Sequence, residues 1–521
     1  MKSESMLCLV AAVAMMAGCA EPGSDTQARS IMTLPDVQSA SPWFVDGQQA
    51  VQAGDDLFGD AARGRARNVI LFVGDGMGIS TVTAARILAG QRAGNPGEEH
   101  RLSFEYFPVT GLMKTYNTNQ QTPDSAGTMT AMATGVKTRA GVIAVDEHVR
   151  RGDCDSSKGK GLLSVLELAE SHGKATGMVT TARVTHATPA ATYAKSPERD
   201  WESDDALPET AREAGCRDIA AQLVSFDKGD GIEVVMGGGR RHFLPREEGG
   251  RRNDGRHLIR EWQQAYPQGH YVDSATQLEG VPAQGPLLGL FASSHMAYEA
   301  QRQDSELDQP SLSAMTALSL ERLSDNKNGY FLMVEAGRID HGHHAGSAFN
   351  ALNETVEFSE AVRVAMENTD PRDTLIIVTA DHSHVFTIAG YPTRGNPILG
   401  KVVGNNEHGE PESEPVHAAD DRPYTTLGYM NGPGFAQRGA VGNPDERKQM
   451  PVNAGRQDLS GVNTRSPGYH QESLVPMTSE THAGEDVGVW ARGPGALLLS
   501  GTHEQNVIFH VMARAAGLLP D

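Results

Sequence analysis

The sequence has few cysteines, fewer basic than acidic residues, and no apolar run that approaches the ~18 residues of a membrane-spanning helix. Of its 521 residues, 45 are Lys or Arg and 66 are Asp or Glu, so the net charge is −21. This acidic excess argues against nucleic acid as a partner, because clusters of Lys and Arg bind phosphate backbones. With 39% hydrophobic and 21% charged residues, the chain can form a core, which excludes global disorder.

Residues 1–19 differ from the rest of the chain. Lys2 precedes an apolar stretch from Leu7 to Ala17, which is the length of a secretory signal rather than of a membrane span. The stretch ends in Ala17-Gly18-Cys19, which resembles the lipobox of bacterial lipoproteins, where the cysteine is lipidated and becomes the mature N-terminus. An ordinary secretory signal cleaved nearby is the alternative. We expect a signal peptide at 1–18, a tether at 19–41 anchored through Cys19, and export to the periplasm or cell surface.

The cysteine count agrees with export. The four cysteines are Cys8, Cys19, Cys154 and Cys216. Cys8 leaves with the signal and Cys19 would carry lipid, so Cys154 and Cys216 remain as an even pair in an oxidising compartment. The two either form a disulfide or are unrelated buried thiols.

Apolar segments of strand length alternate with segments of helical period, which predicts an α/β fold with a doubly wound, mostly parallel sheet and helices on both faces. A helix should also begin at Pro42, with Ser41 as its N-cap. The expected strands are 68–73, 176–181, 232–236, 330–334, 374–379 and 486–490, and the expected helices include 161–172, 218–226 and 311–323. Residues 391–470 are rich in Gly, Pro, Asn and charge, and we expect them to be an insertion on a core formed by 42–390 and 471–521.

Acidic and histidine residues gather where the expected strands end, the edge at which open α/β sheets bind ligands. So many carboxylates at one edge would repel one another without cations, which predicts a cluster of metal ions. Mixed imidazole and carboxylate sets suit zinc, and all-oxygen sets suit magnesium. The expected zinc ligands are Asp340, His344 and His482 for one ion, and Asp381 and His382 with Asp75 for a second; the expected magnesium ligands are Asp75, Thr188 and Glu335.

A candidate nucleophile precedes a helix-like run. Ser125 follows Pro123-Asp124, and Met129 to Ala133 continue the segment. At a helix N-terminus, backbone N–H groups and the helix dipole would favour an anion beside this serine; the alternative role is that of a helix cap. No Ser-His-Asp order is present, so a metal ion would have to activate the hydroxyl.

Five motifs carry a resemblance to a known family. They are Val73–Gly78, Pro123–Thr128, Glu335–His344, Thr379–Phe386 and Thr481–Asp486. In this order they resemble the alkaline phosphatases, most closely the animal tissue-type branch. The resemblance extends from about residue 42 to the C-terminus. It implies a homodimer with two Zn and one Mg per active site, which hydrolyses a broad range of phosphate monoesters through a phosphoserine at Ser125.

The resemblance also implies roles for individual residues. The three metal sets above match the family's ligands, and Arg199 aligns with an arginine that clamps phosphate. His186 and His341 occupy positions where some bacterial relatives have Asp and Lys, and they would tune magnesium and phosphate binding. Cys154 and Cys216 match a family disulfide.

Further expectations concern the dimer and calcium. Residues 391–470 match a crown insertion at the dimer interface, and Tyr391 resembles a tyrosine that reaches the partner's active site. Phe291 and Asp308 resemble two ligands of a calcium site found in the animal branch, but Ala292 replaces a ligating glutamate. This replacement puts calcium in doubt.

Other function classes fit the sequence less well. A sulfatase or phosphodiesterase of the same superfamily would use another nucleophile motif, and a cofactor-independent phosphoglycerate mutase is cytosolic, which the leader contradicts. A lipoprotein that only scavenges metal or phosphate would need no nucleophile. Ser125 together with Arg199 therefore favours a phosphomonoesterase.

Overall fold

The computed structural model describes residues 31–304, 307–437 and 443–519. The expected signal peptide, Cys19 and residues 20–30 of the expected tether lie outside these ranges. From Asp36 the chain packs against the core. Helix α1 (Asp36–Ser39) carries the buried Gln38, whose side-chain amide donates to the carbonyl oxygens of Thr134, at 2.7 Å, and Leu163, at 2.9 Å.

A ten-stranded sheet in the order β17-β2-β16-β8-β1-β7-β3-β4-β6-β5 forms the centre of the molecule. Its strands are β1 (Asn68–Gly74), β2 (Val109–Lys114), β3 (Ala175–Arg183), β4 (Val234–Gly238), β5 (His270–Val272), β6 (Leu287–Leu290), β7 (Tyr330–Ala336), β8 (Thr374–Ala380), β16 (Val487–Arg492) and β17 (Gly501–Glu504). Strand β16 is antiparallel to both of its neighbours, and all other neighbours are parallel. The expectation of a mostly parallel sheet is confirmed.

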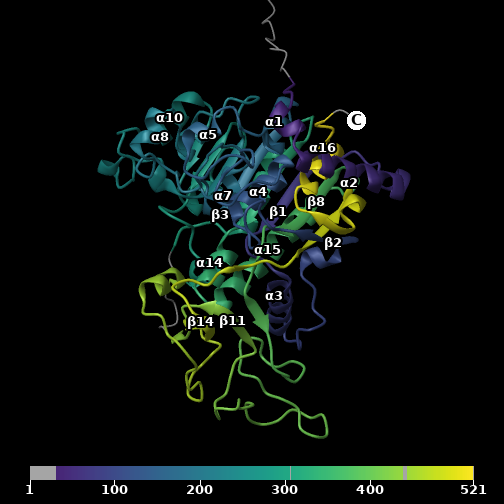
Figure 1. The fold of residues 1–521 in the computed structure, drawn as a ribbon, viewed down its shortest axis with the longest axis vertical. Coiled ribbons are helices and arrows are strands. Elements are labelled where there is room, and N and C mark those ends of the chain that lie inside the picture. The colour runs from purple at the N-terminus through teal and green to yellow at the C-terminus, as the bar shows by residue number, and fades with distance from the viewer. Residues whose placement is uncertain (1–30, 305–306, 438–442, 520–521) are drawn as a thin grey trace, which may run out of the picture.

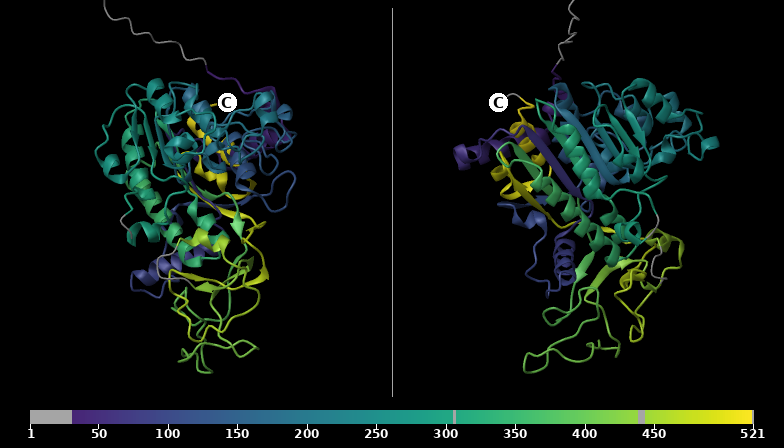
Figure 2. Two further views of the ribbon diagram at one scale, coloured as in Figure 1. Left: turned by 90° about the vertical axis from the view of Figure 1, so that its left-hand side faces the viewer. Right: turned by 180° about the vertical axis from the view of Figure 1, so that it is seen from behind.

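Helices pack in two groups on the two faces of this sheet (Figures 1 and 2). One group surrounds α15 (Ala348–Glu367) and includes α3 (Ile79–Arg92), α12 (Glu299–Asp304), α13 (Leu312–Leu323) and α14 (Arg338–His344). The other surrounds α16 (Val507–Ala516) and includes α2 (Pro42–Phe58), α4 (Ser125–Thr134), α6 (Val165–Ser171) and α7 (Ala187–Ala190). Helix α2 begins at Pro42 after Ser41, as expected.

The remaining elements are short. The helices are α5 (Cys154–Ser157), α8 (Glu209–Glu213), α9 (Ile219–Val224), α10 (Leu258–Ala265) and α11 (Ala275–Glu279), with 3-10 turns η1 (Gly59–Ala61), η2 (Ser103–Tyr106), η3 (Arg240–His242), η4 (Arg246–Glu248), η5 (Pro444–Gln449) and η6 (Ala496–Leu499). The strands are β9 (Ser383–His384), β10 (Phe386–Ile388), β11 (Leu427–Gly432), β12 (Ala436–Gln437), β13 (Tyr469–His470), β14 (Ser473–Pro476) and β15 (His482–Ala483).

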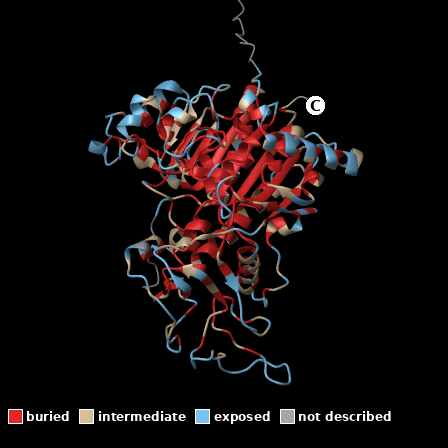
Figure 3. Cartoon of the chain, viewed as in Figure 1, coloured by how far each residue is buried: buried red, intermediate tan, exposed pale blue. Residues whose placement is uncertain are grey.

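The segment expected as an insertion lies at the end of the molecule away from α1 and α16 (Figure 1). Its centre is a small sheet in the order β10-β11-β14, which also uses residues just outside 391–470. Buried residues concentrate in the large sheet and its helices, whereas the insertion is largely loops with many exposed residues (Figure 3). Across the described residues, we find no helix with the length and apolarity needed to cross a bilayer.

Candidate active site

Three carboxylates meet at the carboxyl ends of adjacent central strands. Asp75 follows β1, Glu335 lies near the end of β7, and Asp381 follows β8. Strand β1 pairs in parallel with both β7 and β8, in a register that aligns Gly74 with Ala336 and Ala380. Because all three strands end at the same level, the sheet itself brings the carboxylates together.

Asp340, His344 and His482 form the first expected zinc set. Asp340 and His344 lie one turn apart on α14, with Asp340 Oδ1 3.2 Å from His344 Nε2. His482 Nε2 lies 3.4 Å from the same oxygen and 3.1 Å from His344 Nε2. Although burial raises the pKa of Asp340, the neighbouring imidazoles of His344 and His384 hold it well below its usual range. A carboxylate and two ring nitrogens therefore converge on one point.

The second nitrogen of each of these rings contacts a backbone carbonyl. His482 Nδ1 lies 2.8 Å from the oxygen of Pro123, and His344 Nδ1 lies 2.6 Å from that of Glu480. When Nδ1 donates to a carbonyl, Nε2 carries the lone pair. A hydrogen bond of this kind typically orients a metal-binding histidine. With Nδ1 protonated in His344 and His482, the two Nε2 lone pairs are free to bind a cation at the point where these atoms converge.

Asp75, Asp381 and His382 form the second set. His382 Nε2 is 3.2 Å from Asp381 Oδ2 and 3.5 Å from Asp75 Oδ1. Within the described ranges, both oxygens of Asp75 and Oδ2 of Asp381 are buried without a hydrogen-bond partner. Burial, followed by the charge of Asp381, raises the pKa of Asp75 well above its usual value. Unpaired buried carboxylates are costly, and a divalent cation would satisfy these oxygens.

The all-oxygen set adjoins the second one through Asp75. Glu335 Oε1 and Thr188 Oγ1 are buried without a hydrogen-bond partner in the described part of the chain. Burial raises the pKa of Glu335 to about 7. A ring nitrogen of His186 lies within 4.8 Å of ligand atoms of both Asp75 and Glu335. The structure therefore brings this histidine to the expected magnesium set, where it could itself be a ligand.

Ser125 is the first residue of α4, and Asp124 is the N-cap that precedes it. The cap is therefore the aspartate, which leaves the serine hydroxyl for another role. Ser125 is 2% exposed, and its Oγ lies 3.2 Å from His382 Nε2. The hydroxyl thus borders the second metal set.

Arg199 lies beside this helix start. Its Nη1 donates to Asp124 Oδ2 at 2.9 Å, and its Nη2 is 3.4 Å from His186 Nε2. Ser125, Arg199, His186 and His341 line one cavity of about 460 Å³, together with Asp340, His344 and His482. Ser125, Arg199 and the first expected zinc set therefore face the same space.

Two functional positions were not predicted from the sequence. His384 Nε2 contacts Asp340 Oδ1 at 2.8 Å, and its Nδ1 contacts Glu480 Oε2 at 2.6 Å. His384 thereby links the Asp340 carboxylate to Glu480 and fixes its position. His384 stands in the Asp381–His384 motif and Glu480 lies two residues before His482, so proximity to the ligands was the available signal. His295 also lines the cavity, and no sequence signal marked it.

The remaining expected residues, those of the disulfide, the dimer contact and the calcium site, lie away from this cavity. Cys154 and Cys216 form a disulfide, with Cα atoms 5.9 Å apart. Tyr391 is 93% exposed. The Asp308 carboxylate accepts from the backbone N–H of Thr276 at 3.0 Å, while Phe291 is buried in the core beside Ala292. The Asp308 carboxylate therefore contacts the start of helix α11, and among the described residues it joins no group of three or more His, Cys, Asp or Glu side chains that could hold a cation.

Known proteins resemble this chain over most of its length. The family model for alkaline phosphatase matches residues 66–518. The chain is 46% identical to the tissue-nonspecific alkaline phosphatase of Gallus gallus over 472 residues, 88% of this chain and 85% of the relative. It is 44% identical to the Homo sapiens tissue-nonspecific isozyme over 467 residues, 87% and 84% of the two chains. The crystal structure of Thermus thermophilus alkaline phosphatase superposes with a TM-score of 0.61 at 27% identity, covering 89% of this chain and 94% of that one. The chain therefore belongs to the alkaline phosphatase family of metal-dependent hydrolases that act on phosphate monoesters.

Proposed function

We propose that the chain hydrolyses phosphate monoesters to an alcohol and inorganic phosphate through a phosphoserine at Ser125, with little selectivity for the alcohol. The position of Ser125 carries this proposal: its hydroxyl lies at the N-terminus of α4, in the cavity that Arg199 also lines. The backbone N–H groups and dipole of a helix N-terminus favour an anion. Ser125, Arg199 and the helix N-terminus would bind the phosphoryl group. The alcohol part of the substrate would make few contacts with the protein.

We further propose two zinc ions and one magnesium ion as cofactors. Asp340, His344 and His482 would hold one Zn, Asp75, Asp381 and His382 the other, and Asp75, Thr188 and Glu335 the Mg. In the second and third sets, several buried oxygens have no hydrogen-bond partner among the residues that the structure describes, which supports this assignment. When bound, the cations would lower the pKa of the attacking hydroxyl and offset charge on the phosphoryl group.

The chain's own residues would bind the phosphoryl group and carry out the two displacement steps. The planar guanidinium of Arg199 can bind two phosphoryl oxygens at once, and Asp124 holds it beside Ser125. Ser125 Oγ attacks phosphorus, the P–O bond to the alcohol breaks, and the alcohol leaves with a proton. Water then attacks the phosphoserine, phosphate leaves, and Ser125 regains its proton.

Ser125→Ala tests the nucleophile. We expect turnover of p-nitrophenyl phosphate to fall by at least ~10³-fold, because loss of a nucleophile removes the covalent route, and acid-quenched protein should carry no phosphoserine. Ser383→Ala is the control, since Ser383 is a nearby buried hydroxyl without a hydrogen-bond partner among the described residues. A phosphoprotein that forms equally in Ser125→Ala would refute the proposal. Faster turnover of bis-p-nitrophenyl phosphate or of p-nitrophenyl sulfate would instead indicate a diesterase or a sulfatase.

Metal analysis tests the cofactors. Protein purified without chelator should contain two Zn and one Mg per chain, and chelation should abolish turnover until both metals are restored. Glu335→Gln should lose magnesium in preference to zinc. A verified metal-free protein with full activity would exclude the metal proposal.

We also propose that the protein is an exported, lipid-anchored homodimer. The lipobox-like Cys19 supports the anchor, and the exposure of Tyr391 supports a contact with a partner subunit. Mass spectrometry of the mature N-terminus should find acylated Cys19, and Cys19→Ser should release the protein from membranes. Sedimentation should give twice the chain mass. A soluble wild-type protein that begins elsewhere than residue 19 contradicts the anchor.

A further inference from the structure

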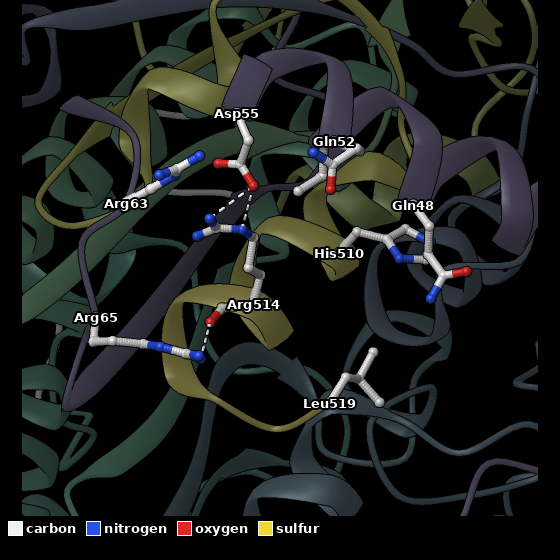
Figure 4. Close-up of a pocket in the computed structure, with 9 residues that line it drawn as sticks. Gln48, Gln52, Asp55, Arg63, Arg65, His510, Arg514 and Leu519 are labelled. Atoms are coloured by element: carbon white, nitrogen blue, oxygen red, sulfur yellow. Dashed lines mark hydrogen bonds and ion pairs between the residues drawn. The ribbon is translucent and has the colours of Figure 1, made fainter. Parts of the chain in front are cut away.

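Arginine ion pairs tie distant segments of this chain together. Beside a cavity of about 480 Å³ between α2 and α16, Arg514 Nη2 pairs with Asp55 Oδ2 at 2.7 Å and so joins the two helices (Figure 4). Another arginine, Arg151, lies next to the segment that carries Arg199 and pairs with the carboxylates on either side of it. No step of the proposed reaction uses Arg151, yet it contacts both sequence neighbours of the expected phosphate clamp.

The guanidinium of Arg151 binds both acidic neighbours of Arg199. Its Nε donates to Glu198 Oε2 and its Nη2 to Glu198 Oε1, each at 2.8 Å, and Nη2 also lies 3.4 Å from Asp200 Oδ2. The Arg151 side chain is 48% exposed and that of Glu198 is 16% exposed. A single exposed ion pair is weak, but a bidentate pair also fixes geometry. Arg151 therefore restrains the chain on both sides of Arg199.

Gly141 contacts both Arg151 and Arg199. Its carbonyl oxygen accepts from the backbone N–H of Arg199 at 2.9 Å, and its own N–H donates to Asp124 Oδ2 at 2.9 Å, the oxygen that also accepts from Arg199 Nη1. A Cβ atom at residue 141, where φ is +80°, would lie 2.4 Å from Cδ and Nε of Arg151 and would displace this side chain. Arg199 is thus held at its backbone by Gly141 and at its guanidinium by Asp124. Arg151 packs against the same glycine.

Backbone hydrogen bonds join these two segments as well. Ile143 and Ser196 exchange two of them, at 2.8 and 3.0 Å. The N–H of Gly152, next to Arg151, donates to the carbonyl oxygen of Pro197 at 2.8 Å. Because these bonds do not involve side chains, replacing Arg151 should loosen the phosphate clamp without unfolding the segments.

We propose that Arg151 is a positioning residue for Arg199. By pairing with the carboxylates on either side, it holds the Arg199 guanidinium in the geometry that binds two phosphoryl oxygens. A side chain that is already ordered loses less entropy when it binds, so positioning raises affinity. The inference rests on the proposed role of Arg199 as the phosphate clamp. Asp124 contacts the guanidinium itself, whereas Arg151 acts through the chain on either side of it.

Positioning and simple charge attraction predict opposite results for Glu198. If Arg151 only added positive charge near the phosphate, removing the negative charge of Glu198 would strengthen phosphate binding. If the pair positions Arg199, loss of either partner should weaken it. We therefore expect Arg151→Gln and Glu198→Gln each to raise the inhibition constant of inorganic phosphate roughly 2- to 10-fold. The double variant should show no further rise, because each change breaks the same pair.

Inhibition kinetics with p-nitrophenyl phosphate, on enzyme purified without chelator, measure these constants. KM should rise with the inhibition constant while kcat does not fall in parallel, because binding rather than the chemical step is affected. The rise in melting temperature that inorganic phosphate causes gives a second measurement, independent of turnover, and it should shrink in the same variants. A fall in kcat with unchanged phosphate binding would overturn the proposal.

Arg199→Ala separates positioning from other roles. Alone it should raise the phosphate inhibition constant roughly 10- to 100-fold, since hydrogen bonds to a charged group are lost. Arg151→Gln added to Arg199→Ala should cause no further rise, because its effect is transmitted by Arg199; an additive rise would overturn the proposal. An unchanged constant in Arg199→Ala would refute the clamp itself, and with it the role of Arg151. Weaker binding in Arg199→Ala with an unchanged constant in Arg151→Gln would refute the positioning alone.

Arg150→Gln is the matched control. Arg150 precedes Arg151, its side chain is 74% exposed, and its Nε donates to Asp153 Oδ2 at 2.9 Å. The control should bind phosphate as the parent does. Equal weakening in Arg150→Gln and Arg151→Gln, or tighter phosphate binding in Glu198→Gln, would show a diffuse effect of charge, and either result would overturn the proposal.

Discussion

Asp124 Oδ2 accepts a hydrogen bond from Arg199 Nη1 at 2.9 Å, while Asp124 Oδ1 caps the helix that begins at Ser125. One carboxylate therefore fixes both the expected phosphate clamp and the expected nucleophile. Although burial raises the pKa of Asp124, Arg199 and the backbone N–H groups of Gly127 and Gly141 hold it below its usual value. Asp124 stays ionised as long as Arg199 is present.

Asp124→Asn should keep the helix cap and loosen Arg199. Holding a released arginine again on binding costs about 0.5–1.5 kcal/mol, so the inhibition constant of phosphate should rise roughly 2- to 10-fold. Inhibition kinetics with p-nitrophenyl phosphate measure this, and an unchanged melting temperature would show that the cap persists. Tighter phosphate binding in the variant would mean that the lost negative charge outweighs the lost positioning.

His384→Gln should weaken zinc binding at Asp340, His344 and His482. Burial lowers the pKa of His384, but the carboxylates of Glu480 and Asp340 raise it to about 10, so the imidazolium donates to both. Loss of a group that orients a metal ligand typically costs 10- to 100-fold in metal affinity. Zinc-buffered titrations of activity and metal content measure the change. His343→Gln is the control, because His343 contacts Thr81 and Tyr429 instead; the same zinc affinity in both variants contradicts the role of His384.

His341→Lys and His186→Asp should separate phosphate binding from magnesium binding. A lysine adds positive charge to the cavity, so phosphate should bind several-fold more tightly and turnover should slow at alkaline pH if release is limiting. An aspartate beside Asp75 and Glu335 adds negative charge, so magnesium should bind more tightly. Phosphate inhibition constants and magnesium titrations from mildly acidic to strongly alkaline pH test both. Unchanged values in both variants would leave the two histidines with a packing role.

Cys154→Ser with Cys216→Ser should lower the free energy of unfolding by about 4 kcal/mol. The bond closes a loop with a sequence separation of 62, and the chain-entropy model assigns a loop of this length that stabilisation. Cys154 also packs with Trp201 and Leu207 in a small apolar cluster. Urea unfolding of the oxidised parent and of the double variant measures the difference. Free thiols at both positions in the denatured, unreduced parent would show that no disulfide forms.

Glu354→Gln should stabilise the protein at high pH. Burial raises the folded-state pKa of Glu354 to about 8, from an ordinary value of 4.5. Between these pH values the folded state binds the extra proton, so the stability of the parent falls as pH rises from 4.5 through about 8 and then levels off. The variant lacks this loss and should gain about 4 kcal/mol over the parent at pH 9 relative to pH 5. A difference in melting temperature that is the same at pH 5 and pH 9 would contradict it.

The central strands could be read from the sequence, and the lateral ones could not. Strands β1, β7 and β8 are buried on both faces, so each is a mostly apolar run with an acidic residue at or just beyond its end. Strand β2 instead alternates buried Val109 and Met113 with exposed Thr110 and Leu112, and it contains a glycine. Strand β17 is partly exposed and polar, and β5 and β6 are too short to show a period. Their pairing depends on neighbours distant in the chain.

The same distinction holds at the site. The residues expected as ligands follow strand ends or share a helical turn, and these local patterns are visible in the sequence. The residues that support these ligands cannot be found from local patterns, because His384 joins Glu480 to Asp340 across about 140 positions of chain, and His482 contacts Pro123 across 359 positions. Arg199 too has no local signature, since its partner Asp124 is 75 positions away. Such contacts exist only once the sheet has assembled.

Strand β16 lies between β2 and β8, so a segment from the last part of the chain closes the middle of the sheet. Until residues 487–492 have left the ribosome, β2 has neither of its partners, because β17 comes later still. His482, just before β16, arrives equally late. During synthesis the strands from β8 to β5 can pair earlier, but β2 remains without a strand partner, and the group formed by Asp340, His344 and His482 is complete only after the C-terminal segment is released.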